Sequence, residues 1–426
     1  MRHAHPRIAA ALGCILAAMA AAAPAAAQDG TRAPIEAAMR YTVKVSTIVD
    51  HPFGYEEKGR HSGAGFVVDR ARGWIVTNAH VASASPSRIR VNFRNGEPIA
   101  ARKLHVDALV DLAVLAIPPA SMPEAATAAE LDCAQEATLG QAAIAFGHPW
   151  SLDFTATRGI VSSIRSTLGV EKLQTDAAVN SGNSGGPLIA EATGRVIGVN
   201  FARVGARSGT EGLNLAVPAR YACTILALLR EGRDPSPPAL PVAFAETSRD
   251  RELVVGSVDA PWAGSLRIGD RILSVNGDAA ARYASRMVDI ARGAPSLRVS
   301  VRRGEETREF DLPVPPERIR ATPRGLAVSG MVVGPASEFG MPADRLAIQH
   351  VDDASAADDA ELRDRDELVA VAGEAVSGLE ALRALLEARR DQAVEVIVRR
   401  RTSRHESYMR VLRLEVGEVE QVGDWR

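Results

Sequence analysis

The sequence predicts a mainly β protein, with barrels or sandwiches first and two related smaller modules after them. Three observations predict this class. Short β-branched runs separated by Gly, Asn, Pro or Asp recur over residues 42–218. A proline-rich linker, "RDPSPPALP" at 233–241, then divides the chain. Beyond it, "LRIGDRILSVNG" at 266–277 is repeated imperfectly as "LRDRDELVAVAG" at 362–373.

The first half of the chain is expected to contain two series of strands. The first series covers residues 62–69, 73–81, 87–93 and 111–117. The second covers residues 141–147, 155–164, 194–202 and 212–218. A helix is expected over 219–231, where Leu226 and Leu229 lie on one side.

These patterns divide the chain into predicted segments. They are a signal peptide (1–27), an N-terminal segment (28–45), a first domain (46–232), the linker (233–241), two modules (242–316 and 324–416) and a tail (417–426).

The first 27 residues are typical of a cleavable secretory signal. Arg2 and Arg7 precede an Ala/Leu-rich stretch at 8–19, and Ala25-Ala26-Ala27 forms a small-residue cleavage site. The stretch is too short and too alanine-rich for a membrane anchor, and no later segment could span a bilayer. We therefore expect a periplasmic protein rather than a secreted or lipid-anchored one.

Composition excludes one class of partner. The 426 residues include 50 basic and 52 acidic ones, with a net charge of −2, and the two signs are interspersed. Nucleic-acid binding therefore has no electrostatic footprint. No metal and no cofactor are expected.

Two cysteines, Cys133 and Cys223, remain after removal of the signal. In an exported protein they permit one disulfide, and two buried free thiols are the alternative.

The stretch "AAVNSGNSGGPLI" at 177–189 contains a candidate nucleophile. Ser184 has glycine after it and two residues before it, which favours it over Ser181. The G-x-S-x-G pattern also occurs in α/β-hydrolases, where the histidine follows the serine and the serine begins a helix. Here a strand-like run follows, and the only later histidines lie in the repeated modules. Residue order therefore excludes a lipase or esterase.

The general base should precede the serine. The histidines available are His51, His61, His80, His105 and His148. His80 follows a buried strand directly, which places an imidazole at a barrel rim. Asp111 begins "DLAVLAI", where a carboxylate needs a hydrogen-bond partner such as a histidine N–H. Asp107, in a solvated pair with His105, is a poorer candidate, and Asp176 is expected to be structural.

The motifs "TNAHV", "DLAVL" and "GNSGGPL", in this order, resemble those of the HtrA/Deg family of trypsin-like serine proteases. The resemblance is dense over residues 45–220. It implies a chymotrypsin-like pair of six-stranded β-barrels followed by two small α+β PDZ-like domains. By motif, His80 is the general base, Asp111 orients it and Ser184 is the nucleophile. The backbone N–H groups of Gly182 and Ser184 form the oxyanion hole.

The resemblance also bears on specificity. In this family the residue six before the nucleophile lies at the base of the substrate pocket, and here it is Ala178. Val179, Val199 and Phe201 are expected to line the same pocket. Without an acidic residue, the pocket should accept small or medium apolar side chains.

PDZ domains bind extended C-termini by strand addition. The candidate carboxylate-binding loops are Val242, Ala243, Phe244 and Ala245 in the first module, and Gly325, Leu326, Ala327 and Val328 in the second. Both stretches could equally be first strands. The second module is divergent, because Arg365 stands where the first has Gly269.

The function implied is an ATP-independent serine endopeptidase of protein quality control. Its partners would be unfolded polypeptides, C-terminal peptides and copies of itself in a homotrimer or higher homo-oligomer, with "MRYTVKVSTIV" at 39–49 as the contact. The alternative is a PDZ-based peptide-binding chaperone or adaptor with weak or regulated proteolysis.

Overall fold

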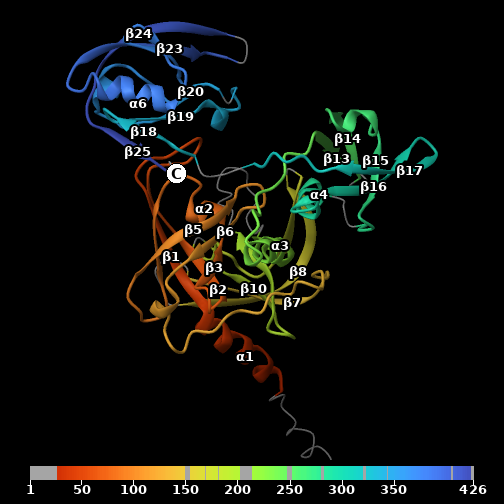
Figure 1. Ribbon diagram of the computed structural model, residues 1–426. Coiled ribbons are helices and arrows are strands. Elements are labelled where there is room, and N and C mark those ends of the chain that lie inside the picture. The colour runs from red at the N-terminus through yellow and green to blue at the C-terminus, as the bar shows by residue number, and fades with distance from the viewer. Residues whose placement is uncertain are drawn as a thin grey trace, which may run out of the picture.

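The computed structural model describes residues 26–148, 154–167, 169–180, 182–201, 214–246, 252–279, 283–319, 323–342, 344–403 and 406–423. The predicted signal peptide, except for its last two residues, and the rival serine Ser181 lie outside the described residues. Within these ranges the chain is mainly β, as predicted: two closed barrels come first and two separate sheets follow them (Figure 1).

The first barrel contains the strands that carry the histidine and aspartate motifs. It is closed in the order β1-β2-β3-β6-β5-β4. The strands are β1 (Thr42–Val49), β2 (Gly59–Asp69), β3 (Trp74–Thr77), β4 (Arg88–Asn92), β5 (Ile99–Asp107) and β6 (Leu112–Ala116). Helix α1 (Ala26–Tyr41) precedes them, the short helix α2 (Ala79–Ala82) follows β3, and a 3-10 turn spans Pro119–Ser121.

Most of the segment expected as the oligomer contact, residues 39–49, lies within the first barrel. Most of it is strand β1, which pairs with β2 and β4 on its two sides. Val43 and Val45 are fully buried in the barrel core. Its alternating apolar residues are explained by folding within one chain. The barrel also begins at Thr42, ahead of the predicted boundary at residue 46.

The second barrel carries the serine loop and is closed in the order β10-β11-β12-β9-β8-β7. Its strands are β7 (Ala142–Gly147), β8 (Thr155–Thr167), β9 (Val170–Thr175), β10 (Pro187–Ala190), β11 (Val196–Phe201) and β12 (Asn214–Pro218). Helix α3 (Ala219–Arg230) follows it, within one residue of the prediction.

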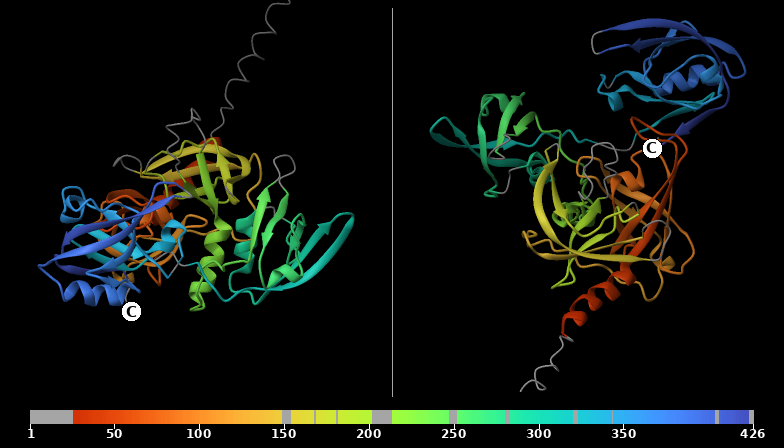
Figure 2. Two further views of the ribbon diagram at one scale, coloured as in Figure 1. Left: turned by 90° about the horizontal axis from the view of Figure 1, so that it is seen from above. Right: turned by 180° about the vertical axis from the view of Figure 1, so that it is seen from behind.

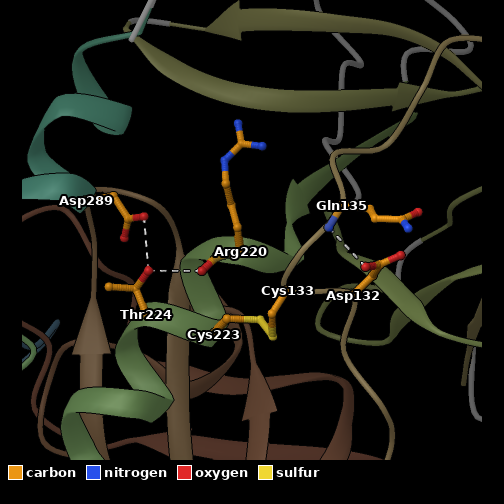
Figure 3. Close-up of a disulfide and its surroundings, with 7 residues drawn as sticks. All are labelled: Asp132, Cys133, Gln135, Arg220, Cys223, Thr224 and Asp289. Carbon is orange, nitrogen blue, oxygen red and sulfur yellow. Dashed lines mark hydrogen bonds between the residues drawn. A yellow bond between two sulfur atoms is a disulfide. The ribbon is translucent and has the colours of Figure 1, made fainter. Parts of the chain in front are cut away.

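The disulfide left open by the sequence is formed. Cys133 and Cys223 are joined, with their Cα atoms 5.8 Å apart, across a sequence separation of 90 residues. The bond ties the segment before the second barrel to α3 (Figure 3).

The first module is a five-stranded sheet in the order β13-β14-β15-β16-β17. Its elements are β13 (Val242–Glu246), β14 (Leu253–Val258), a 3-10 turn (Trp262–Gly264), β15 (Arg271–Val275), α4 (Ala284–Ala291), β16 (Ser296–Arg303) and β17 (Glu306–Pro313). Residues 233–241 before it contain no strand or helix.

The second module is a larger sheet, in the order β24-β23-β21-β20-β19-β18-β25 with β22 beside β21. Its strands are β18 (Gly325–Val328), β19 (Met331–Pro335), β20 (Leu346–Val351), β21 (Glu367–Val371), β22 (Glu374–Ala375), β23 (Ala393–Arg401), β24 (Ser407–Glu415) and β25 (Val419–Val422). Its helical segments are a 3-10 turn (Ala336–Phe339), α5 (Ala356–Asp359) and α6 (Leu379–Glu387). The segment predicted as a tail therefore contributes a strand to the sheet.

Helix α4 of the first module packs on the second barrel and α3. The Ser285 side chain contacts Tyr221 Oη (2.9 Å) and accepts the Glu171 N–H (3.1 Å). Thr224 donates to the Asp289 carboxylate (3.2 Å), as Figure 3 shows.

The second module packs on the loop between β1 and β2 (Figure 2). Phe53 is buried with Val332 and Val422 of the module. A Cβ on Gly325 or Gly334 would lie within 2.7 Å of the Phe53 ring, so these glycines make room for the ring.

Candidate active site

The structure brings His80 and Asp111 together at the rim of the first barrel. β3 ends at Thr77 and leads into α2, which carries His80. His80 Nδ1 lies 2.9 and 3.1 Å from the two Asp111 carboxylate oxygens. One of these oxygens also accepts the His80 backbone N–H (3.0 Å). The carboxylate is thus fully engaged with one residue, as a base-orienting acid must be.

The backbone of Asp111 is in the left-handed region, at φ 64°. Asp tolerates this conformation better than most residues. Neighbouring side chains hold it there: Asn78 donates to the Asp111 carbonyl (2.9 Å), and Lys172 donates to the Val110 carbonyl (3.1 Å).

Lys172 is a buried cation next to this aspartate. It is 6% exposed, and its ammonium lies 4.9 Å from the centre of the Phe201 ring. Burial lowers the pKa of Lys172, while Asp111 and Asp107 oppose that shift. The Phe201 ring in turn meets the His80 ring edge-on, with centroids 5.5 Å apart. Lys172 therefore contacts the Phe201 ring, which packs against His80, and the carbonyl that precedes Asp111.

The serine loop needs glycine at two positions. Gly182 has φ 102° and Gly185 has φ 85°, where side chains are strained. A Cβ at Gly185 would also lie 2.2 Å from the Ala64 carbonyl oxygen. This close approach packs the loop onto the first barrel, where the Ala64 N–H donates to the Ser184 carbonyl (2.7 Å). Ser184 itself is 5% exposed.

The rival acids have other partners. Asp107 and His105 are buried rather than solvated, and Asp107 forms an ion pair with Arg292 of the first module. The prediction of a solvated His105–Asp107 pair is therefore wrong, because the first module, which is distant in the sequence, covers the pair. Asp176 accepts the Ile160 N–H (2.6 Å) and ties the serine loop to β8, as expected for a structural residue.

The four residues proposed for the substrate pocket differ in exposure. Ala178 is exposed, and its carbonyl accepts the Thr157 hydroxyl (2.7 Å). Phe201 is partly exposed, Val179 is 7% exposed, and Val199 is fully buried.

Both proposed carboxylate loops lie in strands. Residues 242–245 fall in β13 and residues 325–328 form β18. This is the alternative that the sequence left open. The described residues contain no group of three or more His, Cys, Asp or Glu side chains placed to hold a metal ion.

Comparison with known proteins agrees with the barrels and with the second module. A model of the trypsin-like peptidase domain matches residues 63–199, and a PDZ domain model matches residues 348–400. The serine protease HhoA of Synechocystis sp. is 31% identical over 323 residues, which cover 66% of this chain and 79% of HhoA. The chain belongs to the HtrA/Deg family.

Further HtrA/Deg relatives match over smaller shares of their length. Bovine mitochondrial serine protease HTRA2 is 32% identical over 62% of each chain. The Escherichia coli periplasmic pH-dependent serine endoprotease DegQ is 31% identical, and the match covers 56% of this chain and 55% of DegQ. Among solved structures, the HtrA-type protease AlgW with tripeptide has a TM-score of 0.53 and 26% identity, over 67% of this chain and 98% of AlgW.

The family and the barrel architecture make this HtrA/Deg chain a serine endopeptidase. Three residues around the site were not singled out from the sequence: Asn78, Lys172 and Gly63. A Cβ on Gly63 would lie 2.7 Å from the Ser184 carbonyl oxygen, so it allows the same barrel contact as Gly185.

Proposed function

We propose that this HtrA/Deg chain is an ATP-independent endopeptidase that degrades unfolded or misfolded exported proteins through an acyl-enzyme. The observation that supports the proposal is the His80–Asp111 contact on a barrel against which the loop of Ser184 packs, with left-handed glycines on either side of the serine. Such an arrangement serves nucleophilic catalysis by a serine.

Each residue has one role in the proposed mechanism. Ser184 Oγ attacks the scissile carbonyl carbon while His80 Nε2 takes its proton. Asp111 fixes the tautomer with the proton on Nδ1 and stabilises the imidazolium. The N–H groups of Gly182 and Ser184 hold the oxyanion. His80 then protonates the leaving amine, and water hydrolyses the acyl-enzyme by the same route.

We propose a preference for small or medium apolar residues before the cleaved bond. Ala178 supplies no negative charge for a lysine or arginine, and Val179, Val199 and Phe201 add apolar surface. Profiling cleavage sites in unfolded casein measures this. Strong cleavage of arginine esters by the wild type, lost in Ser184→Ala, would contradict it.

The place of action and the partners are inferred from three features. The Cys133–Cys223 disulfide favours an oxidising compartment such as the periplasm, which fits a signal at residues 1–27. Among the described residues, no helix is long and apolar enough to cross a membrane. β13 lies at a sheet edge, where an extended C-terminal peptide could add a strand. We also propose a homotrimer or a higher homo-oligomer.

The test uses a chain without the first 27 residues and unfolded casein as substrate. Ser184→Ala and His80→Ala should each lower the rate by at least ~10³-fold. His61→Ala is the matched control, because His61 contacts only the Glu57 carbonyl among the contacts described and should keep full activity. A wild type that leaves casein intact but prevents its aggregation would favour the PDZ-based chaperone instead.

A further inference from the structure

Apart from the short β22, the second module has two strands without a counterpart in the described part of the first. The strands β19-β20-β21-β23-β24 repeat the order of β13-β14-β15-β16-β17. The repeated sequences place β15 and β21 at equivalent positions. Strands β18 and β25 then lie beyond β19, on the side where the described part of the first module ends at β13.

The register confirms that β13 and β19 are equivalent. Val242 and Ala243 pair with Val258 and Ser257, and a bulge follows before Phe244. In the second module Met331 and Val332 pair with Val351 and His350, and a bulge follows before Val333. The segment that corresponds to residues 242–245 is thus 331–334, not the 325–328 expected from sequence.

The outer edges of β13 and β19 differ in whether another strand pairs with them. In the first module, Val242 and Phe244 are only partly buried, and no described strand pairs with the outer side of β13. In the second, β18 runs antiparallel along β19, with Leu326 opposite Val333. β25 then runs antiparallel along β18, with Val422 opposite Gly325.

The side chains of these added strands are well packed. Leu326 and Val328 of β18 are buried in one cluster with Leu379, Leu382 and Leu386 of α6. β18 therefore fills the space between β19 and the helix. Val422 of β25 is 4% exposed and packs with Phe53 of the protease domain.

We propose that the second module is closed to peptides by its own chain, with β18 and β25 as the permanent occupants of its binding edge. A peptide that adds to a sheet needs unpaired backbone groups, and here two strands already use them. The module instead serves as a fixed contact for the protease loop that carries Phe53. The second part of the proposal is that peptides bind only at β13. This part rests on the proposed peptide binding of the first module.

Hydrogen exchange of the full Ser184→Ala chain tests both statements separately. The probe is a synthetic Ala/Ser decapeptide that ends in Val-Val-Val with a free carboxylate. At saturation we expect slower exchange in residues 242–246 and unchanged, slow exchange in 325–328 and 419–422. Faster exchange in 419–422 would mean displacement of β25 and would overturn the proposal. No change in 242–246 would defeat peptide binding by the first module and leave the closed second module intact.

A strand-replacement experiment provides the second test. A Ser184→Ala chain that stops at Val416 should bind a labelled peptide of residues 417–423, "GEVEQVG", with one site more than the full chain has. The same peptide with Val422→Asp should bind at least tenfold more weakly, because it would bury a charge beside Phe53. Equal uptake by the shortened and full chains would contradict the proposal. If the shortened chain does not fold, an oxidised Ala327→Cys/Glu420→Cys full chain decides, since these residues are paired. Failure to cross-link would overturn the proposal.

Discussion

At the scale of single residues, the candidate acid is held by its backbone as much as by its side chain. Asp111 stands at φ 64°, and its strained peptide units accept hydrogen bonds from Asn78 and Lys172. Such strain persists only where the surroundings fix it, and it is common at active sites. The orientation of His80 therefore depends on residues that do not react.

Lys172 provides the test of this dependence. Lys172→Met keeps the length of the side chain but removes the donor to Val110 and the cation beside Phe201. We expect kcat to fall about tenfold with KM nearly unchanged, because small misplacements of catalytic groups are costly.

Lys172→Arg should recover part of the lost kcat, since it restores a buried cation. Thermal unfolding of both variants checks that the fold is intact. A loss that appears in KM alone, or an Arg variant no better than Met, would argue that Lys172 only fills space.

At the scale of elements, strand β5 carries two buried titratable residues, His105 and Asp107. Burial lowers the pKa of His105 to about 4, with Arg292 adding to the shift and Asp107 and Asp234 opposing it. The folded chain thus keeps His105 neutral, while the unfolded chain protonates it at about 6.5. Between these values the unfolded state binds more protons, so stability falls as the pH falls.

His105→Gln should remove this part of the acid sensitivity. Between pH 7 and pH 4.5, the free energy of unfolding of the wild type should fall by about 2–3 kcal/mol more than that of the variant, as measured by urea unfolding. His61→Gln, on the same barrel, should behave as the wild type does. If the free energies of unfolding of the wild type and of His105→Gln changed with pH in parallel, His105 would not be the source of the acid sensitivity.

The disulfide joins α3 to the segment ahead of the second barrel. Closing a loop of this length restricts the unfolded chain, so Cys133→Ser/Cys223→Ser should lower the free energy of unfolding by about 2–4 kcal/mol. Thermal unfolding with and without reductant measures it. Reductant should shift the wild type and leave the double variant unchanged; an equal shift in both would point to another cause.

At the scale of the whole molecule, sequence patterns predicted the features that depend on residues close together in the chain. The motifs around His80, Asp111 and Ser184, the helix after the second barrel and the repeated strand β15/β21 all follow from short runs of residues. The misjudged features depend on contacts between distant segments. The sequence pattern assigns the apolar residues of β1 to an oligomer contact, whereas β1 pairs with β2 and β4 inside one barrel, and that closure is not visible in a local run of residues. Asp107 looked solvated because its partner, Arg292, is 185 residues away.

This Asp107–Arg292 pair connects the first module to the protease domain. Both side chains are fully buried. The desolvation of two charges cancels much of their attraction, so the pair adds little net stability, yet removing one partner leaves a buried charge. The pair should therefore act as a condition for docking rather than as a source of affinity.

Arg292→Met should weaken the docked state by about 3–5 kcal/mol, and Asp107→Leu/Arg292→Met should recover most of that loss. Release of the module should expose residues 233–241 to added protease and enlarge the radius of gyration in small-angle scattering. Arg298→Met is the matched control, because Arg298 pairs with Asp311 in solvent and such pairs contribute about 0–1 kcal/mol. If the single and double variants release the module equally, the buried pair contributes attraction of its own, and the role of a docking condition is wrong.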